Sequence, residues 1–257
     1  MNSFVAALPM YDWPEARGET DAEWSSLRGL LKERGIDPPA SIVRRNADLP
    51  SVPGGIRSGD GRTIAPDPST LPPDRLDLHT LWRHPALLLA QACWGPMEFG
   101  LAEHVRVVGQ PDYSAFEGGE GAFYSSAILM RRGDAPYDVA APADGAALLP
   151  VERMANARLA YNSVDSMSGL IALTRDLEGR HSLVGLFSEM VETGGHRDSI
   201  VAVAEGRADL CAVDCRSWAM AKRYESLSGR LAVVGWTRRR RGLPFISSLN
   251  SPAYCLG

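Results

Sequence analysis

Short apolar runs alternate with amphipathic segments along most of this chain, and this alternation restricts the fold more than any other feature of the sequence. The first run, FVAALPM at residues 4–10, predicts a buried strand. An amphipathic helix is predicted after Pro14, because Trp24, Leu27 and Leu31 recur at helical spacing. Further strands are predicted at residues 86–93, 105–113, 122–132, 158–162, 209–215 and 231–237. Strands that alternate with helices in this way indicate an α/β fold.

Length and charge exclude several classes of protein. With 257 residues the chain can form one large core or two smaller ones. Its 27 basic and 31 acidic residues give a net charge of −4, which argues against a dedicated nucleic-acid binder, since that function needs a basic face. No run of about 18 apolar residues is present, so no membrane span is expected. The phosphate-loop and zinc-protease motifs are also absent, and we therefore expect no nucleotide, metal or other cofactor.

The N-terminus and the cysteines indicate a reduced compartment if the sequence is complete. No Lys or Arg precedes Arg17, and Pro9 interrupts the apolar run, so the first residues do not form a secretory signal. A chain that starts here is expected to stay in the cytoplasm. No two cysteines form a CxxC pair, and we expect them to be small buried residues and not metal ligands. They are Cys93, Cys211, Cys215 and Cys255.

One segment departs from the alternation. Residues 46–74 are rich in Pro, Gly, Ser and Asp and contain few apolar residues. Because such a stretch can bury little apolar surface, we expect a long surface insertion without a function of its own.

The segment NSVDSMSG, between a predicted strand and a predicted helix, carries the strongest chemical signal. The first amides of a helix have no partner inside it, and the helix dipole is positive at that end. Ser166 and Ser168 add hydroxyls, and Gly169 allows the backbone to approach a ligand closely, which is a suitable arrangement for an anion. In the alternative interpretation, Asp165 or Ser166 only caps the helix. The residues alone leave both interpretations open.

Two further residues lie at similar junctions. In TGGHRDS, His196 stands at the start of a predicted helix, where it either complements an anion or is a structural histidine. Asp214 ends a predicted strand, and carboxylates at the carboxyl ends of strands often face a ligand. Asp214 is equally suited to cap the helix that follows it.

Taken together and in this order, these segments resemble a known family. DSxSG at the start of a helix, then TGGHRDSIVAVAEGRADL, then AVDCRSWA are similar to segments of the phosphate/phosphonate-type substrate-binding proteins of ABC transporters. LPMYDWPE and LWRHPALLLAQACWGP near the N-terminus also resemble that family. The similarity extends from about residue 4 to about residue 245, apart from residues 46–74.

The resemblance implies a type 2 periplasmic-binding-protein fold, with two α/β lobes, a hinge and a central ligand cleft. Lobe 1 would comprise residues 1–115 and 215–257, and lobe 2 residues 116–214. The implied protein is a monomer that binds a small anionic ligand, is not an enzyme, and delivers the ligand to an ABC transporter permease. The family is periplasmic, which conflicts with the absence of a signal in this chain.

The resemblance also implies roles for individual residues. Ser166, the amide of Met167 and Ser168 match the anion-binding turn, which Asn162, Asp165 and Gly169 complete, and His196 matches a histidine that contacts the phosphonate. The aromatic residues that would line the first lobe and the hinge side are Tyr11, Trp94 and Tyr124. The residues at positions where the family varies to select the other end of the ligand are Gln91 and Asp214.

Two other functions are compatible with the same residues. Ser166 or Ser168, His196 and Asp214 are the residue types of a nucleophile–base–orienter triad, so a hydrolase is one alternative. A cytoplasmic ligand sensor with the same fold is the other. The run Arg238–Arg241 is expected to be a solvated face, with a docking or anion-attracting patch as the alternative.

Overall fold

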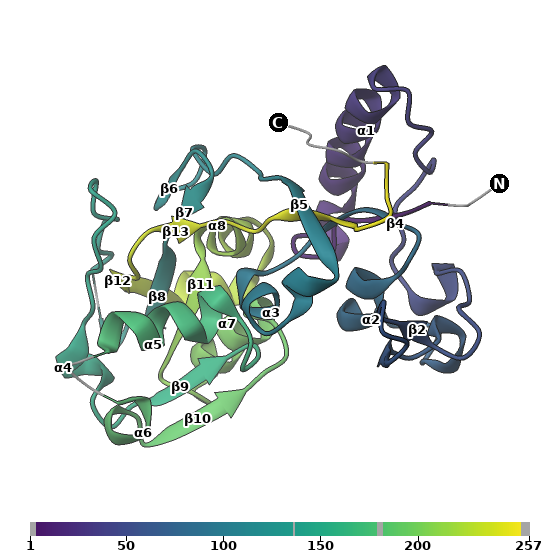
Figure 1. Ribbon diagram of the computed structural model, residues 1–257. Helices are drawn as coiled ribbons and strands as arrows, with labels where there is room; N and C mark the ends of the chain where they lie inside the picture. Colours follow the sequence, from purple (N-terminus) through teal and green to yellow (C-terminus); the bar gives the residue numbers. More distant parts are fainter. Residues whose placement is uncertain (1–3, 136, 179–181, 253–257) are drawn as a thin grey trace. The chain divides into compact units, whose positions relative to one another are not determined.

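The computed structural model describes residues 4–135, 137–178 and 182–252, and it divides the chain into two compact units. Unit 1 comprises Met1–Gln110 and Leu243–Gly257, and unit 2 comprises Pro111–Gly242. The chain passes from one unit to the other twice (Figure 1). An α/β fold with two lobes, the first of them discontinuous, is therefore present.

The boundaries of the units differ from the predicted ones. Residues 215–242 belong to unit 2 and not, as expected, to the first lobe. The reason is strand pairing: β12 (Leu231–Trp236) forms an antiparallel ladder with β8 (Ser126–Arg131), a strand of unit 2. Helix α8 (Cys215–Tyr224) packs against the same sheet.

Unit 1 is built on a four-stranded sheet in the order β1-β4-β14-β5. These strands are β1 (Val5–Ala7), β4 (Leu87–Gln91), β14 (Phe245–Ser248) and β5 (Val105–Gly109). β1 runs parallel to β4, whereas β14 runs antiparallel to both of its neighbours. All five residues of β4 are buried, which explains why their sequence is a continuous apolar run and not an alternating one. The helical elements of unit 1 are η1 (Pro14–Ala16), α1 (Arg17–Glu33), η2 (Asn46–Asp48), η3 (Pro68–Thr70), α2 (Leu78–Arg83), α3 (Trp94–Glu98) and η4 (Leu101–Glu103).

Helix α1 forms where the sequence predicted it. Trp24 and Leu31 are buried on its inner face, and Leu27 is partly buried beside them. The helix ends before Gly35, whose φ of 76° is a left-handed conformation that glycine adopts without strain. Among the residues that the structure describes, no helix combines the length and the apolarity of a membrane span.

The prediction for residues 46–74 is wrong in one respect, because most of this segment is folded. It contains η2, η3 and a hairpin of β2 (Ile56–Arg57) and β3 (Thr63–Ala65). The buried side chain of Asn46 donates to the carbonyl of Pro72 and accepts from the amide of Asp77. Leu49 is buried in the core of unit 1. A few long-range hydrogen bonds and apolar anchors therefore order a stretch whose composition alone indicates a loop.

Unit 2 contains a five-stranded sheet in the order β10-β9-β11-β8-β12. Its remaining strands are β9 (Arg158–Tyr161), β10 (Glu189–Glu192) and β11 (Leu210–Asp214), and a smaller sheet joins β6 (Gly119–Glu120), β7 (Phe123–Tyr124) and β13 (Arg240–Arg241). Its helical elements are α4 (Val151–Met154), the π-helical turn η5 (Met167–Ile171), α5 (Ala172–Leu177), α6 (Leu183–Leu186), α7 (His196–Ala204), α8 and η6 (Ser226–Arg230).

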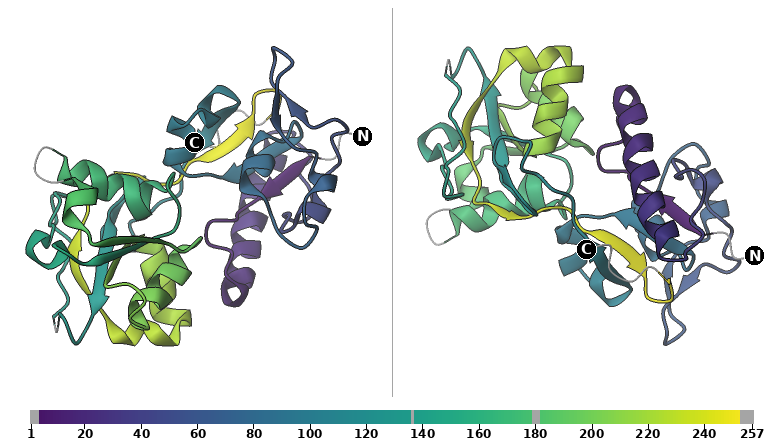
Figure 2. Two further views of the ribbon diagram at one scale, coloured as in Figure 1. Left: turned by 90° about the horizontal axis from the view of Figure 1, so that it is seen from below. Right: turned by 90° about the horizontal axis from the view of Figure 1, so that it is seen from above.

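Helices cover both faces of the large sheet of unit 2. Side chains of α5 and α6 form one core with alternate residues of the strands, whereas α7 and α8 pack on the sheet from the other face (Figure 2). Ile128 and Met130 of β8 face the α5 side, so β8 residues with even numbers point to that face.

The two large sheets share a strand arrangement that fixes where a ligand can be held. In each sheet a single antiparallel strand lies between two others, and that strand follows a passage between the units: β8 follows the first and β14 the second. In unit 2 the start of β8 therefore lies beside the carboxyl end of β11, with Ser126 directly opposite Asp214. Because β9 and β11 are parallel, their carboxyl ends lie at the same edge of the sheet.

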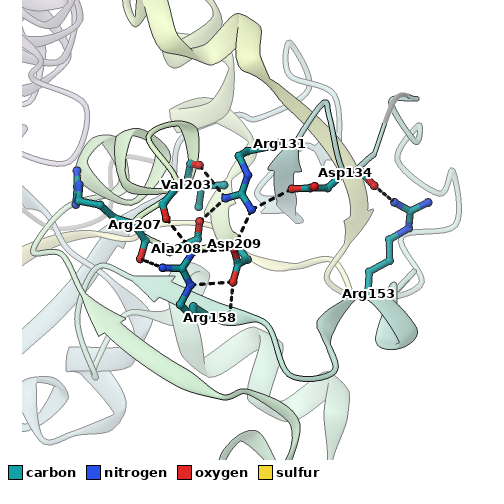
Figure 3. A network of polar contacts seen from close by, with 9 residues as sticks. Arg131, Asp134, Arg153, Arg158, Val203, Arg207, Ala208 and Asp209 are labelled. Atoms are coloured by element: carbon teal, nitrogen blue, oxygen red, sulfur yellow. Dashed lines mark hydrogen bonds and ion pairs between the residues drawn. The ribbon is translucent and has the colours of Figure 1, made fainter.

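Hydrogen bonds between arginine side chains and Asp209 form a network at the opposite edge of this sheet (Figure 3). Asp209 accepts hydrogen bonds from Arg158 Nε at 3.0 Å and from Arg131 Nη2 at 2.8 Å. The same two guanidinium groups donate to the carbonyls of Ala208 and Gly206, after the end of α7. Hydrogen bonds from Arg158 and Arg131 hold the pKa of Asp209 well below its usual range.

We expect Asp209→Asn to lower the free energy of unfolding at pH 7 by about 2 kcal/mol, since it removes charge-assisted hydrogen bonds. Because the pKa of Asp209 is lower in the folded chain, its contribution is present above about pH 4, the ordinary range of the carboxyl group, and disappears as the pH falls through the folded-state value. Urea unfolding at pH 7 and pH 3 measures both effects. Glu205→Gln, which removes the exposed pair with Arg207, is the control and is expected to change stability by less than about 0.5 kcal/mol. Equal effects of the two substitutions would contradict the prediction.

Candidate anion-binding site

The turn after β9 has an unusually wide first helical turn. The amides of Leu170 and Ile171 both donate to the carbonyl of Ser166, at 3.2 and 3.0 Å, and this forms the π-helical turn η5. The side chain of Ser166 caps it by accepting from the amide of Gly169 at 3.0 Å. Single π-helical turns occur frequently at functional sites. Ser166 is therefore a helix cap.

The side chain of Asn162 packs against Gly169 in this turn. A Cβ atom at Gly169 would lie only 1.9 Å from Oδ1 of Asn162 and 3.1 Å from the Ser166 hydroxyl. The glycine therefore makes room for the Asn162 amide beside the first turn. The carbonyl of Asn162 accepts from the amide of Gly194, which links the turn to the segment that leads into α7.

His196 lies within hydrogen-bond distance of this turn. It is the first residue of α7, and its Nε2 is 2.8 Å from the hydroxyl of Ser168. The same nitrogen is 3.4 Å from Oδ2 of Asp214. Burial lowers the pKa of His196 below its ordinary value, although Asp214 opposes this effect. The site thus offers a neutral imidazole at neutral pH.

Asp214 caps a helix, which is one of the two functions considered for it. Its Oδ1 accepts from the amide of Ser217 at 2.9 Å, and its Oδ2 accepts from the hydroxyl of Ser217 at 2.6 Å, so it caps α8. It also lies beside His196, and it is almost completely buried, at 2% exposure. The structure therefore brings Ser168, His196 and Asp214 together.

The contacts of this group do not have the geometry of a hydrolase triad. In a triad the nucleophile and the carboxylate contact different nitrogens of the imidazole. Here Ser168 and Asp214 both lie against Nε2 of His196, and Nδ1 is buried without a hydrogen-bond partner. Asp214 is therefore not placed where the orienting carboxylate of a triad lies, and Nδ1 of His196 is left without a partner among the described residues.

Other buried polar atoms at this edge also lack partners. They are Ser126 Oγ, at the start of β8, and Asn162 Oδ1, after the end of β9. Buried polar atoms without partners are few in folded proteins, and a group of them in one place indicates a site for water or a ligand. The sequence analysis missed Ser126, because its position beside Asp214 depends on the register of two strands that are far apart in the sequence.

The other predicted residues are divided between the units. Tyr11, Gln91 and Trp94 belong to unit 1, where Tyr11 and Gln91 are buried and Gln91 Oε1 has no hydrogen-bond partner. Tyr124 belongs to unit 2, and its ring centre is 5.2 Å from that of Tyr113. Asp165, on the turn itself, accepts from the Ser163 hydroxyl at 2.7 Å. Their contact with a ligand stays a prediction.

Two of the four arginines in the run Arg238–Arg241 form salt bridges. Arg239 pairs with Glu120, and Arg240 pairs with the buried carboxylate of Asp176 at 2.6 Å. Arg238 and Arg241 are exposed. The cysteines are also buried, as the sequence predicted: Cys93, Cys211 and Cys215 are buried and form no disulfide among the described residues. Cys215 begins α8 and does not extend the strand, and Cys255 lies outside the described residues.

Comparison with solved structures identifies the fold. PhnD1 from Prochlorococcus marinus, in complex with methylphosphonate, is 13% identical, and the similarity covers 97% of this chain and 78% of that one with a TM-score of 0.62. The binding protein component of an ABC phosphonate transporter from Pseudomonas aeruginosa is 11% identical, with coverages of 97% and 70% and a TM-score of 0.60. The chain has a periplasmic-binding-protein fold. Another protein with this architecture, from Xanthomonas citri and bound to a chloride ion, is 13% identical, with coverages of 98% and 80% and a TM-score of 0.55.

The resemblance drawn from the sequence is thus confirmed at the level of the fold. Neither a protein-family profile nor a curated protein matches the sequence. At 11–13% identity the periplasmic-binding-protein fold is shared, but the ligand has to be argued from the residues of this chain.

Proposed function

We propose that this chain is a non-enzymatic solute-binding protein that captures a small oxyanion of the phosphonate or phosphate-ester type and presents it to an ABC transporter permease. The observation that carries this proposal is the 2.8 Å contact between Ser168 and His196 at the start of a widened helical turn. A hydroxyl and an imidazole meet there at the N-terminal end of a helix. These are the groups that bind a tetrahedral oxyanion by hydrogen bonds.

The electrostatics of the site fit a bound anion. The ligand charge would be held by the helix dipole, by hydroxyl donors and by His196, which requires no basic surface and agrees with a net charge of −4. The almost completely buried Asp214 beside His196 stabilises the imidazolium when an anion is present. The buried polar atoms without partners, among them His196 Nδ1, would acquire hydrogen bonds from the ligand.

The test is a ligand panel on the purified chain. Methylphosphonate, phosphate, sulfate, methanesulfonate, glutamate and arginine are compared by calorimetry and thermal unfolding. A ligand at 100 times its Kd stabilises a folded protein by about 2.7 kcal/mol, which for a chain of this size corresponds to a rise in Tm of about 5–10 °C. We expect this rise with phosphonate or phosphate. A chain that no anion stabilises at millimolar concentration, or that is stabilised only by the amino acids, would contradict the proposal.

A further inference from the structure

Ser126 has a buried hydroxyl that the folded chain does not use. It is 0% exposed, and its Oγ has no hydrogen-bond partner. Its backbone is paired: the amide donates to the hydroxyl of Thr237 at 2.8 Å, and the carbonyl accepts from the amide of Thr237 at 3.0 Å. Only the side-chain hydroxyl lacks a hydrogen bond among the described residues, and a buried hydroxyl without a partner destabilises the folded chain.

The strand register places this hydroxyl beside the candidate site. Ser126 lies directly opposite Asp214 in an antiparallel ladder, so the two side chains are on the same face of the sheet. Ile128 and Met130, two and four residues further along β8, pack in the same core as Leu170 of the turn η5. Ser126 therefore points to the face that carries η5, and its opposite residue Asp214 lies 3.4 Å from His196.

The carboxylate beside Ser126 already has partners. Asp214 accepts the amide and the hydroxyl of Ser217, and it lies against Nε2 of His196. A ligand group next to Ser126 would therefore meet a neutral hydroxyl that both donates and accepts. An ammonium group there would pair with the charge of Asp214 and depend less on the hydroxyl of Ser126.

We propose that Ser126 is a specificity-determining residue, and that its hydroxyl binds a hydroxyl substituent on the anionic ligand. This inference rests on the proposed function and names the class of ligand: a small oxyanion with a neutral hydroxyl group close to the acid group.

The experiment compares three ligands of similar size on wild-type protein and on Ser126→Ala. The ligands are methylphosphonate, 2-hydroxyethylphosphonate and 2-aminoethylphosphonate, and their Kd values are measured by calorimetry. We expect Ser126→Ala to weaken binding of the hydroxyethyl ligand about tenfold, the effect of one lost hydrogen bond. The affinity for methylphosphonate should change by less than about twofold. For the aminoethyl ligand, whose ammonium group would pair with Asp214, we expect Ser126→Ala to reduce the affinity less than for the hydroxyethyl ligand.

A neighbouring serine provides the matched control. Ser125, the residue before β8, is also buried, and its amide donates to the carbonyl of Gly118. Ser125→Ala is expected to leave all three affinities unchanged. The Tm of Ser126→Ala should equal or exceed that of the wild type, because the substitution removes a polar atom without a partner.

The outcomes separate this inference from the proposed function. If methylphosphonate binds but Ser126→Ala leaves the hydroxyethyl affinity unchanged, the role of Ser126 is wrong and the proposed function stands. An equal or larger loss of affinity for the aminoethyl ligand, or a lower Tm of Ser126→Ala, overturns the inference in the same way. If no phosphonate binds the wild-type protein, both proposals are wrong.

Discussion

Replacing Gly169 by alanine is expected to weaken anion binding by about 5- to 150-fold. A Cβ at this position would lie 1.9 Å from Oδ1 of Asn162, far inside van der Waals contact. Either the Asn162 amide or the turn has to move. Because Gly169 also donates its amide to the cap of Ser166, a shift of the turn displaces the donors that face the anion. Overpacking of this kind costs about 1–3 kcal/mol, and each 1.4 kcal/mol corresponds to a factor of ten in affinity.

The measurement is the Kd for methylphosphonate, and the chain contains a matched control. Gly185 donates its amide to the hydroxyl of Ser182 at 3.1 Å, just as Gly169 does to Ser166. A Cβ at Gly185 would meet only that hydroxyl, at 3.1 Å. Gly185→Ala should therefore leave the affinity unchanged. If Gly169→Ala binds the anion as tightly as Gly185→Ala does, the turn is not the site.

Replacing His196 by alanine is expected to weaken anion binding by about 5- to 150-fold, which corresponds to the 1–3 kcal/mol of a lost hydrogen bond to a charged group. Since Ser168 contacts His196, the two side chains act together. Ser168→Ala alone should have a similar direction of effect, and the double substitution should cost less than the sum of the two single ones. Strict additivity of the two losses would show that the contact does not serve binding. An unchanged affinity of His196→Ala would remove this residue from the site.

The pH dependence of affinity gives a second test of His196. In the ligand-free chain burial lowers the pKa of His196, whereas a bound anion favours the imidazolium and raises that pKa. Binding therefore takes up a proton, and affinity should rise as the pH falls from about 7 through the ordinary range of histidine near 6.5. His196→Gln should lack this rise. Comparing the two proteins with the same ligand cancels the ligand's own ionisation, and coincident pH profiles would contradict the prediction.

Local patterns predicted the elements of this fold well. The apolar stripe and Gly35 predicted α1, and the continuous apolar run at Leu87–Gln91 predicted a fully buried strand. The residues Ser166 and Gly169 predicted a capped turn, which the structure contains, because capping depends only on residues a few positions apart. None of these features requires knowledge of distant contacts.

The errors of the sequence analysis arise where distant residues pair. The segment 46–74 is held in a defined conformation by long-range hydrogen bonds, among them those of the Asn46 side chain with Pro72 and Asp77. The assignment of residues 215–242 to unit 2 depends on the pairing of β12 with β8 across about a hundred positions of sequence. Composition and periodicity carry no information on such contacts.

The sequence by itself determined the α/β class, the position of the capped turn and the residue types that can hold an anion, because each of these follows from local spacing and chemistry. Only the tertiary structure decided that Ser168, His196 and Asp214 meet, that both contacts fall on Nε2, and that Ser126 lies opposite Asp214 with its hydroxyl unused. The physical reason is strand register. A shift of one residue in the ladder between β8 and β11 would turn Ser126 to the other face of the sheet, and the sequence alone does not specify which residues stand opposite each other.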